Sequence, residues 1–79
     1  MALLSAMFSR IETAHTNFED YLMEQANISR DDAKAVTAFY LKKKLAKVDA
    51  GIGRINVKHG GFLDPEVIRK ALEEAKKAD

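Results

Sequence analysis

The sequence contains no cysteine, which excludes disulfide bonds, thiolate nucleophiles and cysteine-ligated zinc and fits a reducing compartment. It also lacks any apolar run near the roughly 20 residues that a helix needs to span a bilayer, so we expect no membrane partner. No basic residues precede the apolar start and no small-residue cleavage pattern follows it, so we expect no signal peptide. These absences together favour a cytoplasmic protein.

Glycine-rich phosphate-binding loops are also missing. The chain has four glycines, and Gly51-Ile52-Gly53 has neither a correctly placed third glycine nor a strand before it. Termination of a helix explains these glycines better, so we predict no nucleotide-binding site here.

The two histidines stand outside any recognised catalytic or metal-binding pattern. His15 has Glu12 and Glu19 at helical spacing, but solvated charge around a half-buried histidine is the commoner arrangement. His59 can approach Asp64, either as an acid–base pair or as a turn-stabilising hydrogen bond. Because no nucleophile with its own motif accompanies them, we predict no enzyme activity, no metal, no cofactor and no small-molecule substrate.

The length of 79 residues suits a single domain spanning residues 1–79. A chain this short buries only about 60–65% of its unfolded surface, so contacts with a partner would add stability. The net charge of +1 hides a segregation, because residues 1–31 carry −3, residues 32–63 carry +5 and residues 64–79 carry −1. This pattern suits self-complementarity within the fold or between copies, or an anionic partner at the centre.

Helical periodicity begins near the N-terminus. Apolar and half-polar side chains recur every three or four residues at Leu4, Phe8, Ile11, His15, Phe18 and Leu22. This spacing predicts an amphipathic helix of about 20 residues that ends near Gln25 to Asn27.

A second helix should follow, with Ser29 at its start. The serine can accept a hydrogen bond from the first turn, and the glycines at 51 and 53 should end the helix. The expected apolar stripe is Ala35, Ala38, Leu41, Leu45 and Val48. Lys43, Lys44 and Lys47 should share its remaining face near the C-terminal end, where cations are favoured.

A short strand and a third helix complete the pattern. Ile55 and Val57 alternate with polar residues, as in a strand that turns at Gly60-Gly61 to pair with Phe62-Leu63, or that pairs with a second copy. At least one glycine of that turn should adopt positive φ. Asp64 should cap a helix that begins at Pro65.

The apolar face of the third helix should consist of Val67, Ile68, Ala71, Leu72 and Ala75. The predicted fold is therefore mainly α, with three helices and a short β-hairpin or single strand between the second and third, in the order α-α-β-α.

Two surfaces are candidates for function. The first is the apolar face of the N-terminal helix, with partner-binding residues Leu4, Phe8, Ile11 and Phe18. The second is the central basic region 42–59, in which cations near an aromatic ring suit phosphate contact and base stacking. Its candidate nucleic-acid-binding residues are Tyr40, Lys43, Lys44, Lys47, Arg54, Lys58 and His59.

The run from Tyr40 to Leu72 carries a resemblance. Its distinctive residues include Lys42, Lys44, Lys47, Asp49, Gly53, Val57-Lys58-His59-Gly60 and Phe62-Leu63-Asp64. With these residues the chain resembles small uncharacterised proteins encoded by bacteriophages and prophages. The resemblance implies a phage setting, either as a virion component or as a binder of a host factor, in the host cytoplasm or the virion. It assigns no residue a role.

The sequence therefore predicts a small helical protein that acts through protein–protein contacts, as a homo-oligomer or inside a larger assembly. The alternative is a small nucleic-acid-binding protein that uses the basic region. The pI of about 8.0 lies below the value above 9 that is typical of dedicated nucleic-acid-binding domains.

Overall fold

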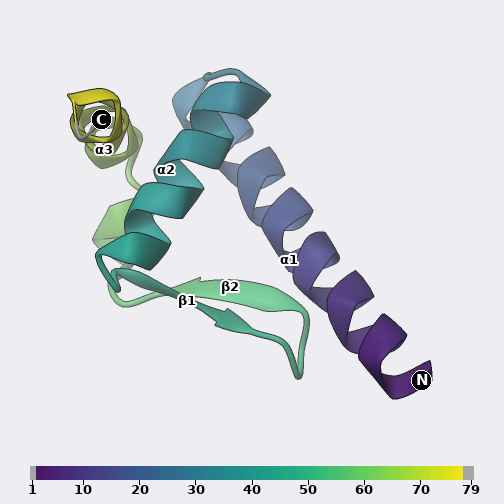
Figure 1. Ribbon diagram of the computed structural model, residues 1–79. Helices are drawn as coiled ribbons and strands as arrows, with labels where there is room; N and C mark the ends of the chain where they lie inside the picture. Colours follow the sequence, from purple (N-terminus) through teal and green to yellow (C-terminus); the bar gives the residue numbers. More distant parts are fainter. Residues whose placement is uncertain (1, 78–79) are drawn as a thin grey trace.

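Three helices and a two-stranded antiparallel hairpin form the fold, which confirms the predicted α-α-β-α order (Figure 1). The structure is a computed structural model that describes the backbone of residues 2–77 and the side chains of residues 8–77. The elements are α1 (Ala2–Ala26), α2 (Arg30–Lys42), β1 (Ala46–Asp49), β2 (Arg54–Val57), a 3-10 turn η1 (Gly60–Leu63) and α3 (Pro65–Lys77). Helix α2 packs against both α1 and α3, and β2 packs along α1.

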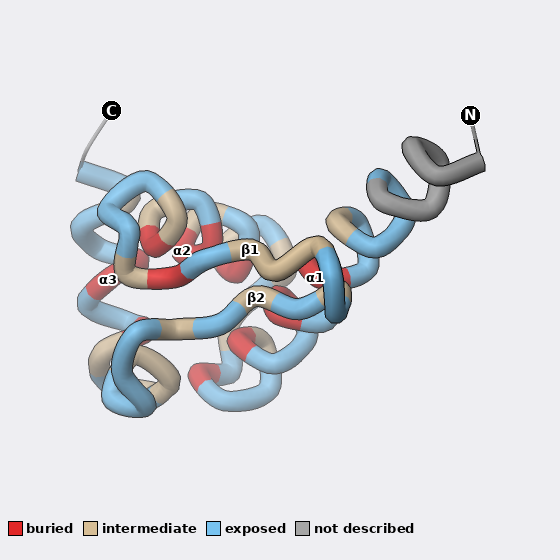
Figure 2. Tube along the Cα trace, turned by 90° about the horizontal axis from the view of Figure 1, so that it is seen from below, coloured by how far each residue is buried: buried red, intermediate tan, exposed pale blue. Residues whose placement is uncertain are grey.

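The core stripe of α1 is shorter than the predicted one. Ala14, Phe18, Leu22 and Ala26 are buried at successive four-residue steps. Of the other predicted positions, Ile11 and His15 are half-buried, Phe8 is exposed, and the side chain of Leu4 lies outside the described residues. Figure 2 shows burial concentrated in the part of α1 that the hairpin and α2 cover.

Asn27 ends α1 in the predicted range. Its φ is 53°, and the Ile28 N–H donates to the Met23 carbonyl at 3.3 Å. This left-handed residue and the long return hydrogen bond form a Schellman ending, in which asparagine replaces the usual glycine.

Ser29 caps α2 as predicted, since its Oγ accepts a hydrogen bond from the Asp32 N–H at 3.2 Å. The buried face is different from the predicted stripe. It consists of Ala33, Val36, Thr37 and Tyr40. Ala38 is exposed, and Ala35 and Leu41 are half-buried. A helix with apolar residues over most of its circumference fits several stripes, and packing between α1 and α3 selects one of them.

The predicted end of α2 is wrong. The helix stops at Lys42, and Lys44 adopts a φ of 61°. The Lys44 N–H donates to the Leu41 carbonyl at 3.1 Å and the Leu45 N–H donates to the Tyr40 carbonyl at 2.8 Å, which completes a second Schellman ending. The three lysines therefore share no helix face, because Lys43 caps α2 and Lys47 lies on β1.

The strand partner was also predicted wrongly. β2 pairs with β1 in the register Val48 to Ile55, and not with Phe62-Leu63. Residues 50–53 form the loop of this hairpin, so the glycines at 51 and 53 belong to a turn and not to a helix end. Gly53 has a φ of 66°, and a Cβ there would lie 3.6 Å from the Arg10 carbonyl oxygen of α1.

Gly60 and Gly61 lie in η1, and neither adopts positive φ, which corrects the prediction for that turn. The start of α3 is confirmed, because Asp64 Oδ1 accepts a hydrogen bond from the Glu66 N–H at 2.9 Å. Ile68, Ala71 and Leu72 form its buried face, with Val67 and Ala75 half-buried beside them.

Candidate functional site

The first candidate surface is the N-terminal arm, which we define as residues 8–11 of α1, where the helix leaves the globule (Figure 1). Phe8 is 66% exposed and Ile11 is half-buried. Ile52, at the tip of the hairpin, is 62% exposed and lines the same hollow as Ser9 and Arg10 of the arm. Two large apolar side chains therefore face solvent at one end of the molecule.

Phe18, the fourth predicted partner-binding residue, lies in the core and is only 7% exposed. Its ring packs near Tyr40 at a centroid distance of 6.5 Å. Of the predicted contact residues whose side chains the structure describes, Phe8 and Ile11 therefore lie outside the buried core.

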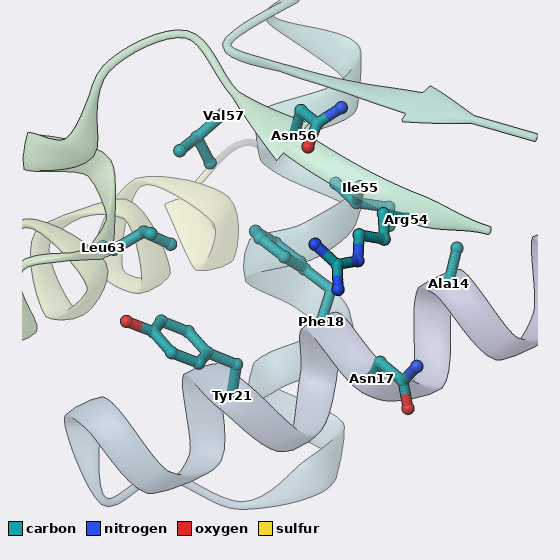
Figure 3. Close-up of a pocket in the computed structure, with 9 residues that line it drawn as sticks. All are labelled: Ala14, Asn17, Phe18, Tyr21, Arg54, Ile55, Asn56, Val57 and Leu63. Carbon is teal, nitrogen blue, oxygen red and sulfur yellow. The ribbon is translucent and has the colours of Figure 1, made fainter. Parts of the chain in front are cut away.

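A groove runs between α1 and β2 (Figure 3). Its apolar half is a hollow of about 460 Å³. Phe18 lies at its base, Tyr21 and Leu63 close one end, and the four residues of β2 form the opposite wall. Tyr21 is 42% exposed, so an aromatic ring borders the groove from the solvent side.

Hydrogen-bonding groups of β2 face this groove. The Lys58 N–H donates to the Leu45 carbonyl at 2.9 Å, and the strand register then makes Asn56 and Arg54 the hydrogen-bonded residues of the hairpin. The intervening Ile55 and Val57 direct their N–H and C=O groups to the free edge. Within residues 2–77, these four groups meet no hydrogen-bond partner.

The other half of the groove is polar and positively charged. Arg54 lines both halves, and its guanidinium lies over the groove in Figure 3. Arg10 joins it at the hairpin end, together with Ser9, Thr13 and Asn17. Among the described residues, no carboxylate lines either half, and neither arginine forms an ion pair.

The predicted basic region does not form one cluster. Lys47 and Lys58 lie on the side of the hairpin opposite Ile55 and Val57, and Asn56 on that side is directly opposite Lys47. Lys43 instead lies over the Phe39 ring, 5.9 Å from its centroid. The hairpin therefore gathers a smaller basic surface than the sequence predicted.

Tyr40 is unavailable for base stacking, because it is 1% exposed at the centre of the core. Its hydroxyl donates to the Phe62 carbonyl at 2.7 Å. Burial raises its pKa to about 12, so the hydroxyl stays protonated at physiological pH. Tyr40 is a structural residue, which corrects its assignment to the nucleic-acid-binding set.

The His59–Asp64 pair is not formed in the part of the chain that the structure describes. The Asp64 carboxylate caps α3, and the His59 ring lies near Phe62 with 6.0 Å between centroids. Neither arrangement of His59 and Asp64 considered from the sequence is therefore present.

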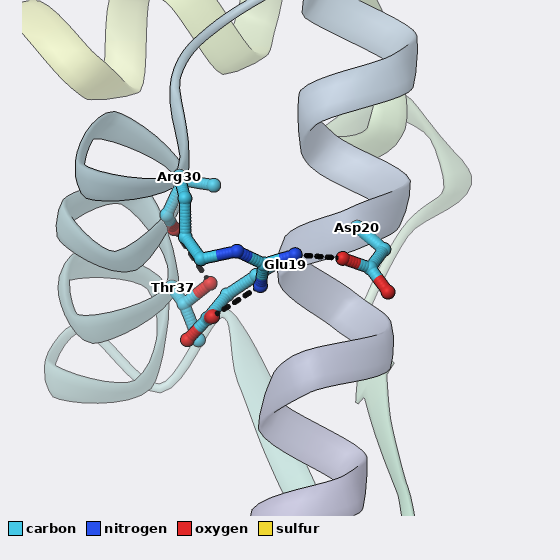
Figure 4. A network of polar contacts seen from close by, with 5 residues as sticks. Glu19, Asp20, Arg30 and Thr37 are labelled. Carbon is cyan, nitrogen blue, oxygen red and sulfur yellow. Dashed lines mark hydrogen bonds and ion pairs between the residues drawn. The ribbon is translucent and has the colours of Figure 1, made fainter.

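A polar network fixes α1 to the start of α2 (Figure 4). Arg30 bonds Glu19 Oε1 at 3.0 Å and also bonds Asp20. These hydrogen bonds, first with Asp20 and then with Glu19, raise the pKa of Arg30. Glu19 is buried, so Arg30 neutralises a charge that would otherwise be costly to bury. The network has a structural explanation.

Among the residues described, no group of three histidine or acidic side chains could hold a metal ion, and no helix is long and apolar enough to cross a membrane.

The sequence analysis did not predict the groove. The alternation of Arg54 to Val57 predicted the strand, but not which of its edges would remain free. Comparison with known proteins finds no matching family model, no similar curated protein and no similar solved structure.

Proposed function

We propose that the chain is a small, non-catalytic protein-interaction or assembly protein that binds a second copy of itself through the N-terminal arm. The observation that carries this proposal is the 66% exposure of Phe8 on a helix segment that extends beyond the core. A phenylalanine at such a position loses unfavourable contact with water when a partner covers it, which stabilises the complex by about 2 kcal/mol.

Charge segregation favours a second copy as the occupant. Residues 1–31 carry −3 and residues 32–63 carry +5, so these oppositely charged segments of two copies can attract each other. The resemblance to phage-encoded proteins suggests the setting, as a virion component or as a protein that binds a host factor. In either case the partner surface would be the same arm.

Substitution of Phe8 by glutamate tests the proposal. Wild-type protein should sediment as a dimer or larger species at micromolar concentration, and Phe8→Glu should sediment as a monomer with an unchanged circular dichroism spectrum. Tyr21→Glu is the matched control, because it also places a carboxylate at an exposed aromatic position but lies outside the arm. A folded wild-type monomer at every concentration would exclude self-association.

Nucleic-acid binding is the second candidate. The observation that favours it is the basic outer side of the hairpin, where Lys47 is opposite Asn56 and Lys58 follows two residues after Asn56. A two-stranded ribbon fits the major groove of DNA, and lysines on its outer side can contact phosphates.

A further inference from the structure

The free edge of β2 and the groove beside it resemble an unfilled strand position. Ile55 and Val57 present two N–H and two C=O groups to the groove, and no described residue satisfies them. A free strand edge of this kind pairs readily with another extended chain, which supplies the missing ladder hydrogen bonds. The next strand position in the sheet is therefore open.

The sides of the groove specify what the added strand should look like. An extended chain directs alternate side chains to opposite faces. Side chains that share the face of Ile55 and Val57 would meet Phe18, Tyr21 and Leu63, so these positions favour apolar residues. Side chains on the other face would lie beside Asn56 and Lys58, where acidic residues are favoured.

The hairpin end of the groove specifies a carboxylate. Arg10 and Arg54 are the charged side chains that line it, and neither is paired with a described carboxylate. Arginine binds carboxylates with strong, charge-assisted hydrogen bonds, and Ser9 and Thr13 add hydroxyl donors. Because Arg54 begins β2, a chain that ends at this position runs antiparallel to the strand.

A second copy of β2 fits this position poorly. In a short antiparallel pairing of two such strands, Arg54 and Lys58 of the two copies lie opposite or diagonal to one another. Like charges at those distances are destabilising. The charge of the groove therefore favours a different, acidic occupant.

We propose that the groove between α1 and β2 binds an extended peptide that adds as a third, antiparallel strand. Its side chains alternate between apolar residues toward α1 and acidic residues toward solvent, and a carboxylate binds Arg10 and Arg54. This site shares Ser9 and Arg10 with the arm but does not use Phe8, on which the proposed self-association depends.

Fluorescence polarisation with a labelled pentapeptide of alternating valine and glutamate, ending in a free valine carboxylate, tests the proposal. Saturable binding is expected below millimolar peptide. The double variant Arg10→Gln with Arg54→Gln should bind about tenfold or more weakly, the loss expected for charge-assisted hydrogen bonds. Lys42→Gln, which removes an exposed charge from α2, is the control and should bind like the wild type.

Peptide variants test the backbone contacts without any risk to the fold of the protein. N-methylation of the amides on one edge of the peptide should abolish binding, and N-methylation on the other edge should preserve it. A peptide with an amidated C-terminus distinguishes the source of the carboxylate. If a glutamate side chain binds the arginines, the amidated peptide still binds. If the C-terminal carboxylate binds them, amidation abolishes binding.

Three results would overturn the proposal: no saturable binding up to millimolar peptide, equal binding by both N-methylated peptides, or full affinity in the double arginine variant. Phe8→Glu protein should bind the peptide as well as the wild type does. Peptide binding and self-association can therefore fail independently of one another.

Discussion

Tyr40 shows that the burial of a residue decides whether it can contact a ligand or only supports the fold. Lysines at positions 42–44 follow it closely in the sequence, which suggested base stacking, yet the ring lies among Phe18, Phe39 and Phe62. The hydroxyl reaches the Phe62 carbonyl, so the side chain ties α2 to the 3-10 turn before α3. Periodicity could not reveal this, because the partner is 22 residues away in the sequence.

Tyr40→Phe should lower the free energy of unfolding by about 1 kcal/mol, because it removes the hydroxyl and leaves the Phe62 carbonyl without its donor. Thermal unfolding followed by circular dichroism measures the loss. Tyr21→Phe is the control, since Tyr21 is 42% exposed. Equal stability of the Tyr40→Phe protein and the wild type would contradict the role of this hydrogen bond.

The same substitution, Tyr40→Phe, should change how the stability of the protein depends on pH. The pKa of Tyr40 is raised from 10.0 to about 12, so the unfolded chain loses this proton before the folded protein does. The stability that the protonated hydroxyl provides is complete below pH 10 and is lost as pH rises toward 12. Across this pH range, the free energy of unfolding measured with denaturant should fall more steeply for the wild type than for Tyr40→Phe.

At the scale of elements, capping residues made the starts of two helices predictable. The end of α2 was not predictable, because no glycine marks it. Ser29 and Asp64 accept hydrogen bonds from first-turn amides, as their positions in the sequence indicated. The end of α2 was missed because Lys44 occupies the left-handed position where glycine is usual. Ala46 and Val48 then fitted either a longer helix or a strand.

Lys44→Gly should stabilise the protein by about 1 kcal/mol, since glycine adopts the left-handed conformation without the Cβ clash that lysine incurs. Chemical denaturation measures the change. Lys42→Gly is the matched control, because Lys42 is the last residue of α2 and its φ is not positive. Glycine there should destabilise by about 0.5–1 kcal/mol. Destabilisation by both substitutions would show that residue 44 is not held in the left-handed conformation in solution.

The groove could not be predicted from sequence for a different reason. Its apolar members, Phe18, Tyr21 and Leu63, come from α1 and the 3-10 turn, and each has an ordinary helical or core interpretation by itself. The groove exists because β1 pairs with one edge of β2, whereas α1 packs beside the other edge and no described strand pairs with it. This arrangement depends on how the elements pack, and no local pattern specifies it.

At the scale of the whole molecule, the three candidate surfaces overlap at a few residues but need different partners. The arm presents apolar area, the groove presents unpaired strand groups beside arginines, and the outer side of the hairpin presents lysines. Arg54 is shared between the groove and the basic region, whereas Lys47 and Lys58 do not line the groove. Variants of Lys47 therefore test the nucleic-acid alternative separately, whereas variants of Lys58 also remove a cation beside the proposed peptide.

If the hairpin binds DNA or RNA, the logarithm of affinity should fall linearly with the logarithm of salt concentration. A slope of about −0.9 per phosphate contact on duplex DNA gives roughly −2 to −3 for Lys47, Arg54 and Lys58 together. Charge reversal of Lys47 and Lys58 to glutamate should abolish binding and leave the helical circular dichroism unchanged, because both side chains are exposed. Lys34→Glu changes the charge by the same amount per site on α2 and should have little effect. A fluorescence titration at low salt that shows no binding to duplex or single-stranded probes would exclude this function, and the lysines would then be solvating or partner-facing charge.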